Sequence, residues 1–537
     1  MPDGGRVESR PADDPVSGLL RSNIVVATGT ALSRVTGLLR VVALGYVLGQ
    51  TALADAYKLA NETPNIVYEL LLGGVLSATL VPLFSTFAED DDEEATNVVL
   101  SVASILMVAL TVVAVVAAPF IFGLYSINVG GGVDESTFRS VGTTLARIFL
   151  VQILFYGLVA LMNAFLNSRR RFFAAAWSPI FPNLVIIVAL LSLPGAGDTL
   201  YDLSDVLDDQ RVRLTLGLGA TLGIASMLVF LVPAALRTGF DFRFRPDFRH
   251  PAVGQLLRMS AWTIGFVIAN QIALVVVRNL ADPGSGIASA YFDAFTFFVL
   301  PHGLLAVSIA TTFQPELARS VARRDKPAFI DQASLGIRMT ALLTIPAGVG
   351  IFVLRRPIVG ALLQHGNFDA TDARNTSRAL AGFALGLAAF SIYLFVLRGF
   401  YAHKDTRTPF TINVVENAIN IALAFLLVDR YGVLGLGLAF ALAYAVSSLW
   451  AMQVLGYKVA GFSAGATLRA IAPMVLAAIL MGEAVWVVAR SIGGDTGMDA
   501  LVRITVGGVS GIVVYLGILL ALRVPELDAI RTRLRRT

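Results

Sequence analysis

The sequence contains no cysteine, few charged residues and few histidines, and each shortage excludes a kind of protein. The absence of cysteine from all 537 residues excludes disulfides, thiolate nucleophiles and cysteine-ligated metals. The four histidines, His250, His302, His365 and His403, are too scattered to form a metal site. Only 15% of the residues are charged, against about 25% in soluble domains, which argues against a soluble enzyme. No phosphate-binding loop ending in Gly-Lys-Ser/Thr is present, so we expect no ATP hydrolysis.

Apolar residues are abundant instead. Hydrophobic residues make up 56% of the chain, and the mean hydropathy is +0.74. A helix that spans a membrane needs about 20 mostly apolar residues, and about fourteen such segments follow one another with no long soluble domain between them. They lie near residues 23–48, 54–87, 96–124, 138–166, 172–194, 213–236, 254–280, 285–317, 328–354, 376–401, 409–428, 432–457, 466–489 and 500–522. The sequence therefore predicts an all-α polytopic membrane protein that is not an enzyme.

Positive charge is unevenly distributed among the loops. If the N-terminus lies in the cytoplasm, arginine and lysine concentrate in the inner loops, for example in 169–171, 237–249 and 319–326. Cytoplasmic loops of membrane proteins carry such an excess, and acidic residues such as those in loop 89–94 count little in this rule. We therefore expect both termini in the cytoplasm. We interpret the net charge of +4 as basic loops rather than nucleic-acid binding.

Short motifs of the first half of the chain recur in the second half at one offset. The recurring positions are Pro82 and Pro315, Phe165 and Phe400, and Pro179 and Pro409, each pair about 230–235 residues apart. This offset covers six predicted helices, and an even number gives both copies the same orientation in the membrane. The sequence therefore predicts two parallel six-helix bundles, with a substrate site between them near the midplane.

The repeat divides the chain into five regions. They are a cytoplasmic tail (1–21), a first lobe (22–236), a second lobe (237–460), two extra helices (461–523) and a basic cytoplasmic tail (524–537). The polar N-terminal tail does not resemble a signal peptide, because no short apolar core with a cleavage site precedes the first helix. The two extra helices fall outside the repeat.

The first two spanning segments carry unusual polar residues, which are costly in a membrane and commonly line a pathway. The first segment holds Arg34 and Arg40, with Ser33 beside them. The second holds a stripe at three- and four-residue steps, which share one helix face: Asp55, Lys58, Glu62, Asn65 and Glu69. Because arginine forms bidentate pairs with phosphate oxygens, the first segment indicates an anionic substrate such as a lipid-linked phosphate or pyrophosphate. The alternative is that both arginines pair with acidic residues of the stripe and hold the two helices together.

The second half adds further candidates. Asp293 is a candidate for a polar cavity, and Arg278 is expected near the outer surface with its charged end in water. His302 follows Pro301, and we expect it to pack at a helix break. A polar face of the eleventh segment carries Asn413, Glu416, Asn417 and Asn420. These oxygen ligands suit a coupling cation, although hydrogen bonding between helices is the favoured interpretation.

An ordered set of motifs carries a family resemblance. In the first half these are Ser33-Arg34, Gly37, Arg40, Asp55-Ala56, Pro64-Asn65, Gly73-Gly74 and Pro82. In the second half they are Pro301-His302-Gly303, Val307-Ser308, Pro315, 363–369, Phe400-Tyr401-Ala402, 405–409 and 432–436. Over about residues 22–460 the sequence resembles the MurJ (MviN) family of lipid II flippases, within the multidrug/oligosaccharidyl-lipid/polysaccharide exporter superfamily.

The resemblance implies a function. Members move lipid II, the undecaprenyl-pyrophosphate-linked peptidoglycan precursor, from the inner to the outer leaflet of the bacterial plasma membrane. By position, Arg34, Arg40 and Asp55 match functional residues of the family, whose cavity arginines hold the diphosphate and sugar. The last two helices are implied to form a groove for the lipid tail. Lipid II and membrane lipid are the implied partners, and we expect no metal and no cofactor beyond a coupling cation.

Two departures from the family pattern affect the expected site. Tyr68 and Glu69 stand where members commonly have an arginine pair, and Thr296 stands near another common arginine. Either Lys58 or Arg278 compensates for these missing cations, or the substrate is held differently.

We expect alternating access, driven by the membrane potential or a cation. Other functions are compatible with the same fold. One alternative is a flippase for another lipid-linked oligosaccharide, of O-antigen or capsule type. A second is a drug/cation antiporter, which the intramembrane arginines disfavour. A membrane glycosyltransferase is disfavoured because the outer loops 125–137 and 195–212 are too short for a catalytic domain.

Overall fold

The described part of the chain is built from helices. The computed structural model describes residues 15–527 except 70–79, 91, 131 and 170, and it leaves out the side chains of 15–25, 67–69 and 255–269. The first half contains α1 (Pro15–Leu48), α2 (Ala52–Ala60), α3 (Glu62–Glu69), α4 (Val81–Glu89), α5 (Glu93–Val116), α6 (Ala118–Tyr125), α7 (Glu135–Leu150), α8 (Gln152–Ser168), α9 (Phe172–Trp177), α10 (Ile180–Leu191), α11 (Leu203–Asp208) and α12 (Gln210–Leu236). The second half contains α13 (Pro251–Leu280), α14 (Ile287–Pro301), the π-helical turn η2 (His302–Ala306), α15 (Val307–Ala322), α16 (Lys326–Leu363), α17 (Ala370–Ala402), α18 (Arg407–Tyr431), α19 (Val433–Lys458), α20 (Ala464–Arg490) and α21 (Gly497–Ala521).

The helices confirm most of the predicted spans. Twelve helical segments of the described residues are long and apolar enough to cross a membrane, and each coincides with a predicted span. The other two predictions, 54–87 and 254–280, overlap residues that are wholly or partly left out of the description. The second of these coincides with α13. The chain is therefore a multi-pass membrane protein, and the count of fourteen stays a prediction.

The second predicted span is interrupted for a local reason. α2 ends at Ala60 and α3 begins at Glu62, with Asn61 between them. Pro64 lies in the first turn of α3, where its missing N–H group would have no helical partner anyway. A continuous helix would instead leave the Ala60 carbonyl without the N–H of residue 64, so the sequence favours a break one turn before the proline.

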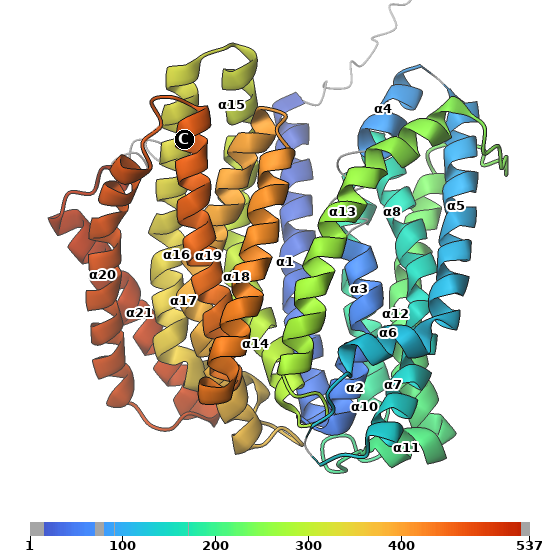
Figure 1. The fold of residues 1–537 in the computed structure, drawn as a ribbon, viewed down its shortest axis with the longest axis horizontal. Coiled ribbons are helices and arrows are strands. Elements are labelled where there is room, and N and C mark those ends of the chain that lie inside the picture. The colour runs from blue at the N-terminus through green and yellow to red at the C-terminus, as the bar shows by residue number, and fades with distance from the viewer. Residues whose placement is uncertain (1–14, 70–79, 91, 131, 170, 528–537) are drawn as a thin grey trace, which may run out of the picture.

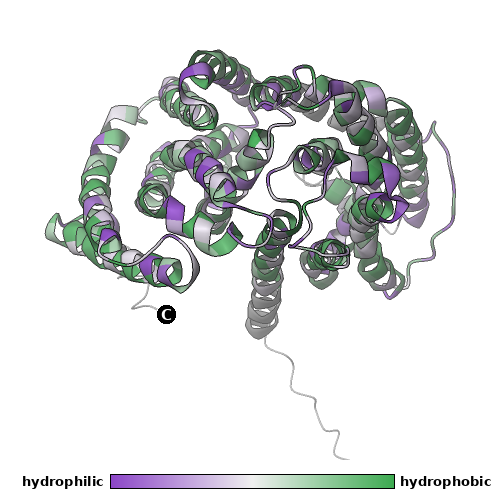
Figure 2. Cartoon of the chain, turned by 90° about the horizontal axis from the view of Figure 1, so that it is seen from below, coloured by the Kyte–Doolittle hydropathy of each residue, from purple (hydrophilic) through white to green (hydrophobic). Residues whose placement is uncertain are grey.

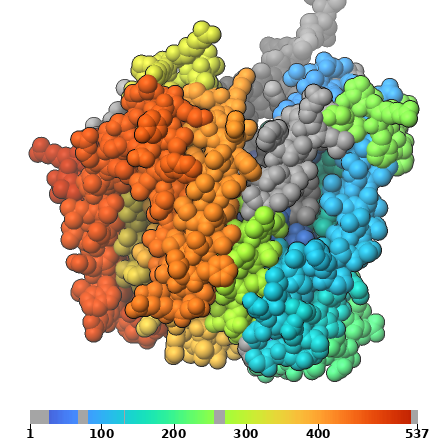
Figure 3. Space-filling view, in the orientation of Figure 1, coloured from blue at the N-terminus to red at the C-terminus, as the bar shows by residue number. Residues whose placement is uncertain are grey.

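The helices gather into two lobes with α1 and α13 between them (Figure 1). The first lobe contains α2–α12 and the second contains α14–α21. Much of the outer helices is coloured as hydrophobic in Figure 2, and large apolar side chains such as Val229 on α12 and Val513 on α21 are exposed, as expected for surfaces that face lipid. Figure 3 shows α18 and α19 in orange on one side and α5–α7 in blue to cyan on the other, with the lower end of α13 in green between them.

Equivalent contacts in the two lobes support the internal repeat. Asn183 on α10 donates from Nδ2 to Thr36 Oγ1 of α1 at 3.1 Å. Asn413 on α18 donates from Nδ2 to Asn270 Oδ1 of α13 at 3.3 Å. In the predicted repeat α10 corresponds to α18 and α1 corresponds to α13. In each half, an asparagine at the equivalent position of the fifth predicted helix therefore forms a hydrogen bond with the first helix. This is expected if the two halves are copies of one unit.

Candidate functional site

Two arginines on α1 lie between the lobes, and no acidic side chain among the described residues pairs with them. α1 contacts α9 and α10 of the first lobe and α14 and α16 of the second. Arg34 is exposed and Arg40 is half-buried. Among the described side chains, no ion pair joins either guanidinium to a carboxylate. Within the same described set, Arg40 Nε is buried and has no hydrogen-bond partner. As far as the described side chains extend, neither guanidinium is neutralised by a carboxylate, which leaves both able to bind an anion.

A wide helical turn in the second lobe leaves space for Arg34. His302 is buried at the start of η2, as predicted for a helix break, and its Nδ1 lies 2.9 Å from Ser391 Oγ. Gly303 is the next residue, and a Cβ built on it would lie 3.4 Å from Arg34 Nη2. Single π-helical turns inside α-helices are frequent at functional sites. Because Gly303 has no side chain, the Arg34 guanidinium can lie next to the second lobe at this turn.

We expect Gly303→Ala to be tolerated and Gly303→Leu to be damaging. A Cβ at 3.4 Å makes an ordinary contact, whereas a leucine side chain would displace the Arg34 guanidinium. Misplacing a binding group by about 1 Å can cost about 100-fold in rate. Growth of a strain that depends on this chain measures the effect. Gly350→Leu on α16 is the control, because a Cβ there meets no atom within 4 Å. Equal growth of the two Gly303 variants would contradict this placement of Arg34.

Four of the predicted charged residues form two ion pairs across the lobe interface. Lys58 Nζ lies 2.6 Å from Asp293 Oδ1 and joins α2 to α14. Arg278 Nη2 lies 3.0 Å from Glu62 Oε1 and joins α13 to α3. The side chains are 9% and 4% exposed in the first pair and 6% and 12% exposed in the second. These cross-lobe ion pairs therefore occupy the polar stripe that the sequence predicted, and each pair shields its charges from the apolar surroundings.

Arg278 does not reach an outer surface, contrary to the interpretation of the sequence. The residue is 5% exposed, and its guanidinium carbon lies 3.5 Å from the ring centroid of Phe292 and 5.1 Å from that of Tyr291. The face of an aromatic ring attracts a cation, most strongly where water is excluded. Together with Glu62, the two rings hold the charge inside the interface.

Asp55 binds the beginning of α14. The residue is fully buried, and its carboxylate accepts hydrogen bonds from the N–H groups of Gly284 and Gly286 at 2.9 Å and of Ser289 at 2.7 Å. A carboxylate at this position also interacts favourably with the positive end of the helix dipole. Gly286 has φ +84°, and a Cβ there would lie 2.0 Å from Gln50 O, so only glycine fits.

Further contacts between the lobes lie where α1 ends. The Asn367 N–H donates to Tyr46 O at 3.0 Å, and the Gln50 N–H donates to Asp372 Oδ2 at 3.0 Å. α1 ends before Gly49, which has φ +59° and packs so closely that a Cβ would lie 2.5 Å from Asn367 O. We call this region, with the Asp55 contacts and the cross-lobe ion pairs, the closed end of the molecule.

The remaining predicted residues have other surroundings. The Ser33 carbonyl accepts a hydrogen bond from Asn183 Nδ2 at 3.3 Å. Asn65 Oδ1 accepts one from the Tyr156 hydroxyl at 3.0 Å. Thr296 donates to the Phe292 carbonyl of its own helix at 3.2 Å. The side chains of Tyr68 and Glu69 lie outside the described residues.

The polar face predicted on the eleventh segment is buried on α18. Asn413 and Asn417 donate from Nδ2 to Asn270 Oδ1 at 3.3 Å and 3.1 Å, so part of this face bonds α13. Asn420 is 8% exposed, and its Oδ1 has no hydrogen-bond partner among the described residues. Glu416 is 1% exposed. Among the described residues, no three or more His, Cys, Asp or Glu side chains are grouped so that they could hold a metal ion.

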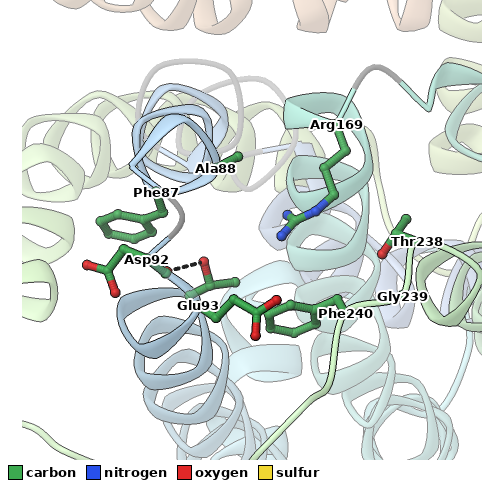
Figure 4. A pocket seen from close by; sticks show the side chains of 9 residues that line it. Phe87, Ala88, Asp92, Glu93, Arg169, Thr238, Gly239 and Phe240 are labelled. Atoms are coloured by element: carbon green, nitrogen blue, oxygen red, sulfur yellow. Dashed lines mark hydrogen bonds between the residues drawn. The ribbon is translucent and has the colours of Figure 1, made fainter.

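A separate cavity of about 280 Å³ lies in the first lobe, near the N-terminal end of α5. Figure 4 shows Arg169 at the end of α8 projecting toward it, opposite Phe87, Asp92 and Glu93. Phe240, from the segment that follows α12, lines another side. The Arg169 guanidinium carbon lies 3.9 Å from the ring centroid of Phe165. This cavity is formed by first-lobe helices and by the start of the connection to the second lobe.

The chain is similar in sequence to proteins of one family. The family model of the lipid II flippase MurJ matches residues 44–507. A probable lipid II flippase MurJ of Vibrio cholerae serotype O1 is 28% identical over 433 residues, which cover 78% of this chain and 80% of that protein. Another, of Rhizobium meliloti, is 29% identical over 476 residues, which cover 87% of this chain and 86% of that protein.

Solved structures show the same fold. A lipid II flippase MurJ in an inward closed conformation matches with a TM-score of 0.74 at 24% identity, over 93% of this chain and 99% of that one. An inward-facing multidrug resistance MATE family transporter of the MOP superfamily matches with a TM-score of 0.63 at 15% identity, over 80% of this chain and 95% of that one. The predicted MOP-type transporter fold is thereby confirmed. Since the family model matches most of its length, the chain belongs to the MurJ family of lipid II flippases.

Proposed function

We propose that this protein moves lipid II from the inner to the outer leaflet of the bacterial plasma membrane. Membership of the MurJ family supports the cargo. The observation that carries the proposal is the pair of arginines on α1, which lie between the lobes without an acidic partner among the described side chains. Guanidinium groups bind phosphate oxygens through two parallel hydrogen bonds. Arg34 and Arg40 are six residues apart on α1, about 9 Å along the helix axis, and we expect both to contact the diphosphate.

The excess of Lys and Arg in the inner loops supports a membrane orientation with both termini in the cytoplasm. The closed end then faces outward, and the arrangement is one that receives cargo from the cytoplasm. Exposed hydroxyl side chains on α15, including Ser308, Thr311 and Thr312, lie toward the cytoplasmic side in this orientation. We infer that the headgroup enters from that side while the polyprenyl tail stays in the lipid.

Transport in this proposal requires the closed end to open. The lobes separate there, which breaks the cross-lobe ion pairs and the hydrogen bonds of Asp55. Rocking of two repeats about a site between them is the alternating-access motion of such transporters. Lys58 and Arg278 become free cations when the lobes part, and they then replace the arginines that are missing at positions 68, 69 and 296.

The energy source in this proposal is the membrane potential or a coupling cation. One charge that crosses 100 mV gains about 2.3 kcal/mol. A cation would take oxygen ligands from Asn413, Glu416, Asn417 and Asn420. The tail would follow α20 and α21, which expose apolar side chains such as Leu476, Ile479 and Val513.

The test uses bacteria depleted of their own lipid II flippase and expressing this chain. We expect growth to return, and lipid II to become accessible to a cleaving enzyme added outside the cells. Growth without that accessibility would contradict direct flipping. If the protein reaches the membrane and neither effect appears, the cargo is not lipid II in that host. A related flippase expressed in parallel excludes a failure of the assay, and extracts are then tested for another lipid-linked oligosaccharide.

A further inference from the structure

The connection between the lobes is attached to the side of α5. This interlobe linker, residues 237–250, joins α12 to α13 and has no helix of its own. The Arg243 N–H donates to Asn97 Oδ1 at 2.8 Å, and the Arg245 N–H donates to Ser101 Oγ at 2.9 Å. Asn97 Nδ2 in turn donates to the Asp241 carbonyl at 3.3 Å. The backbone of the linker thus runs along the helix in a fixed position.

The position of these bonds sets the depth of the linker in the membrane. α5 begins at Glu93, and its apolar run begins at Val98. Ser101 lies eight residues into the helix, about 12 Å from its start. The linker therefore descends from the water to the boundary of the apolar layer. An unpaired backbone N–H group is costly at that depth, and Asn97 and Ser101, which are 4% and 0% exposed, satisfy two of them.

The side chains of the linker suit this boundary. Phe242, Phe244 and Phe248 are 51%, 61% and 53% exposed, so they have no protein core to enter. Phe240 differs, because it packs against Phe165 with ring centroids 4.9 Å apart at the cavity of Figure 4. The exposed phenylalanines thus begin beyond Phe240, where the linker runs along α5.

Arginines alternate with these rings. The linker holds four arginines and two aspartates: Arg237, Arg243, Arg245, Arg249, Asp241 and Asp247. Arg245 pairs with Glu94 at 2.5 Å, and Arg243 pairs with Asp241 at 3.0 Å, both at exposed sites where ion pairs contribute little. Long basic side chains at this depth extend toward the phosphate layer, and anionic lipids attract basic segments.

We propose that the interlobe linker is a surface that binds lipids of the membrane leaflet in which the linker lies. Phe242, Phe244 and Phe248 insert at the boundary between headgroups and acyl chains, and Arg243 and Arg249 bind the phosphates of anionic phospholipids. The hydrogen bonds to α5 hold the linker at the depth at which both contacts form. This inference does not depend on the identity of the cargo.

The linker also fixes one end of α13. Val253 at the start of α13 is buried against Val98 and Val102 of α5, directly after the linker. The other end of α13 carries Arg278 and its cross-lobe ion pair. Lipid bound to the linker therefore holds the first-lobe end of this helix while its far end opens and closes.

The natural absence of cysteine makes the test direct, because a single introduced cysteine is labelled uniquely. Phe244→Cys carries a fluorescent label, and the full-length protein is placed in vesicles that contain lipids with a quencher near the headgroup. The control is Leu200→Cys, at a residue that is 60% exposed in the aspartate-rich loop after α10. We expect quenching at residue 244 to be at least about twofold stronger than at residue 200.

The second arm tests the lipid charge. Vesicles of phosphatidylcholine alone are compared with vesicles that also contain phosphatidylglycerol, in the labelled chain and in the same chain with Arg243→Gln and Arg249→Gln. We expect phosphatidylglycerol to increase quenching, and the double substitution to remove that increase. Quenching at residue 244 no stronger than at residue 200 overturns the proposal. Insertion that is indifferent to phosphatidylglycerol overturns the binding of phosphates by the arginines.

Discussion

Replacing Arg34 or Arg40 by alanine is expected to reduce lipid II transport by about 10- to 100-fold, while the protein stays in the membrane at its normal level. A hydrogen bond to a charged group contributes about 1.5–3 kcal/mol, which corresponds to a factor of that size. The protein level should not change, because neither guanidinium has a carboxylate partner among the described side chains. Accessibility of lipid II to an external cleaving enzyme measures the loss.

Two further variants separate charge from geometry. Lysine at position 34 or 40 keeps the positive charge but loses the planar fork that binds two phosphate oxygens, so we expect intermediate transport. Arg469→Ala is the control, because this arginine is exposed on α20 and donates from Nε to the Gly465 carbonyl of its own helix. Normal transport by both alanine variants would reject the role of these arginines in holding the diphosphate. Loss of the protein from the membrane would instead assign them a structural role.

The second large effect is expected from the ion pair between Lys58 and Asp293. Lys58→Ala leaves the carboxylate of Asp293 in an interface where that side chain is 4% exposed. Breaking a buried pair in this way costs about 3–5 kcal/mol. We therefore expect a large fall in the thermal stability of the purified protein, together with reduced transport. Exchanging the residues, with Lys58→Asp and Asp293→Lys in one chain, should recover most of the stability.

An exposed pair provides the matched control. Arg319 and Glu316 on α15 lie 2.7 Å apart with side chains 64% and 48% exposed. Pairs of this kind contribute about 0–1 kcal/mol, so Arg319→Ala should leave the melting temperature nearly unchanged. If the exchanged variant is no more stable than Lys58→Asp alone, the contact between these two side chains does not hold the lobes together.

The positions of the helices could be predicted from the sequence better than the contacts between side chains of different helices. The spans follow from runs of apolar residues, and the repeat follows from a single offset, so both were accessible without coordinates. Arg34 and Arg40 were also recognisable, since two arginines inside one apolar segment are costly unless they serve a function. That no acidic side chain among the described residues pairs with them could not be predicted, because acidic residues on the next segment fitted a paired arrangement equally well.

The cross-lobe contacts show why the rest was out of reach. Lys58 and Asp293 were both candidates, but they are 235 residues apart, and periodicity along one helix says nothing about its neighbour in space. Arg278 was assigned to the outer surface from its place near a helix end, whereas Glu62 and Phe292 hold it inside. The glycines at 284 and 286, together with the capping residues Asp369 and Asp372, are the sequence signals that indicate a tight junction here.

The break in the second predicted span affects the energetics of any motion between the lobes. α2 is bonded to α14 through Asp55 and Lys58, whereas α4 packs on α8, with the rings of Phe84 and Phe165 6.4 Å apart. α2 also packs on α7 of its own lobe, and the break at Asn61 separates this short helix from α3. Because the helical ladder is already interrupted at Asn61, rotation there requires only a few torsion angles to change and no run of backbone hydrogen bonds to rupture. The activation barrier for separating the lobes is then set by side-chain contacts such as those of Asp55 and Lys58. Single substitutions at these contacts should change the turnover rate without altering the helices.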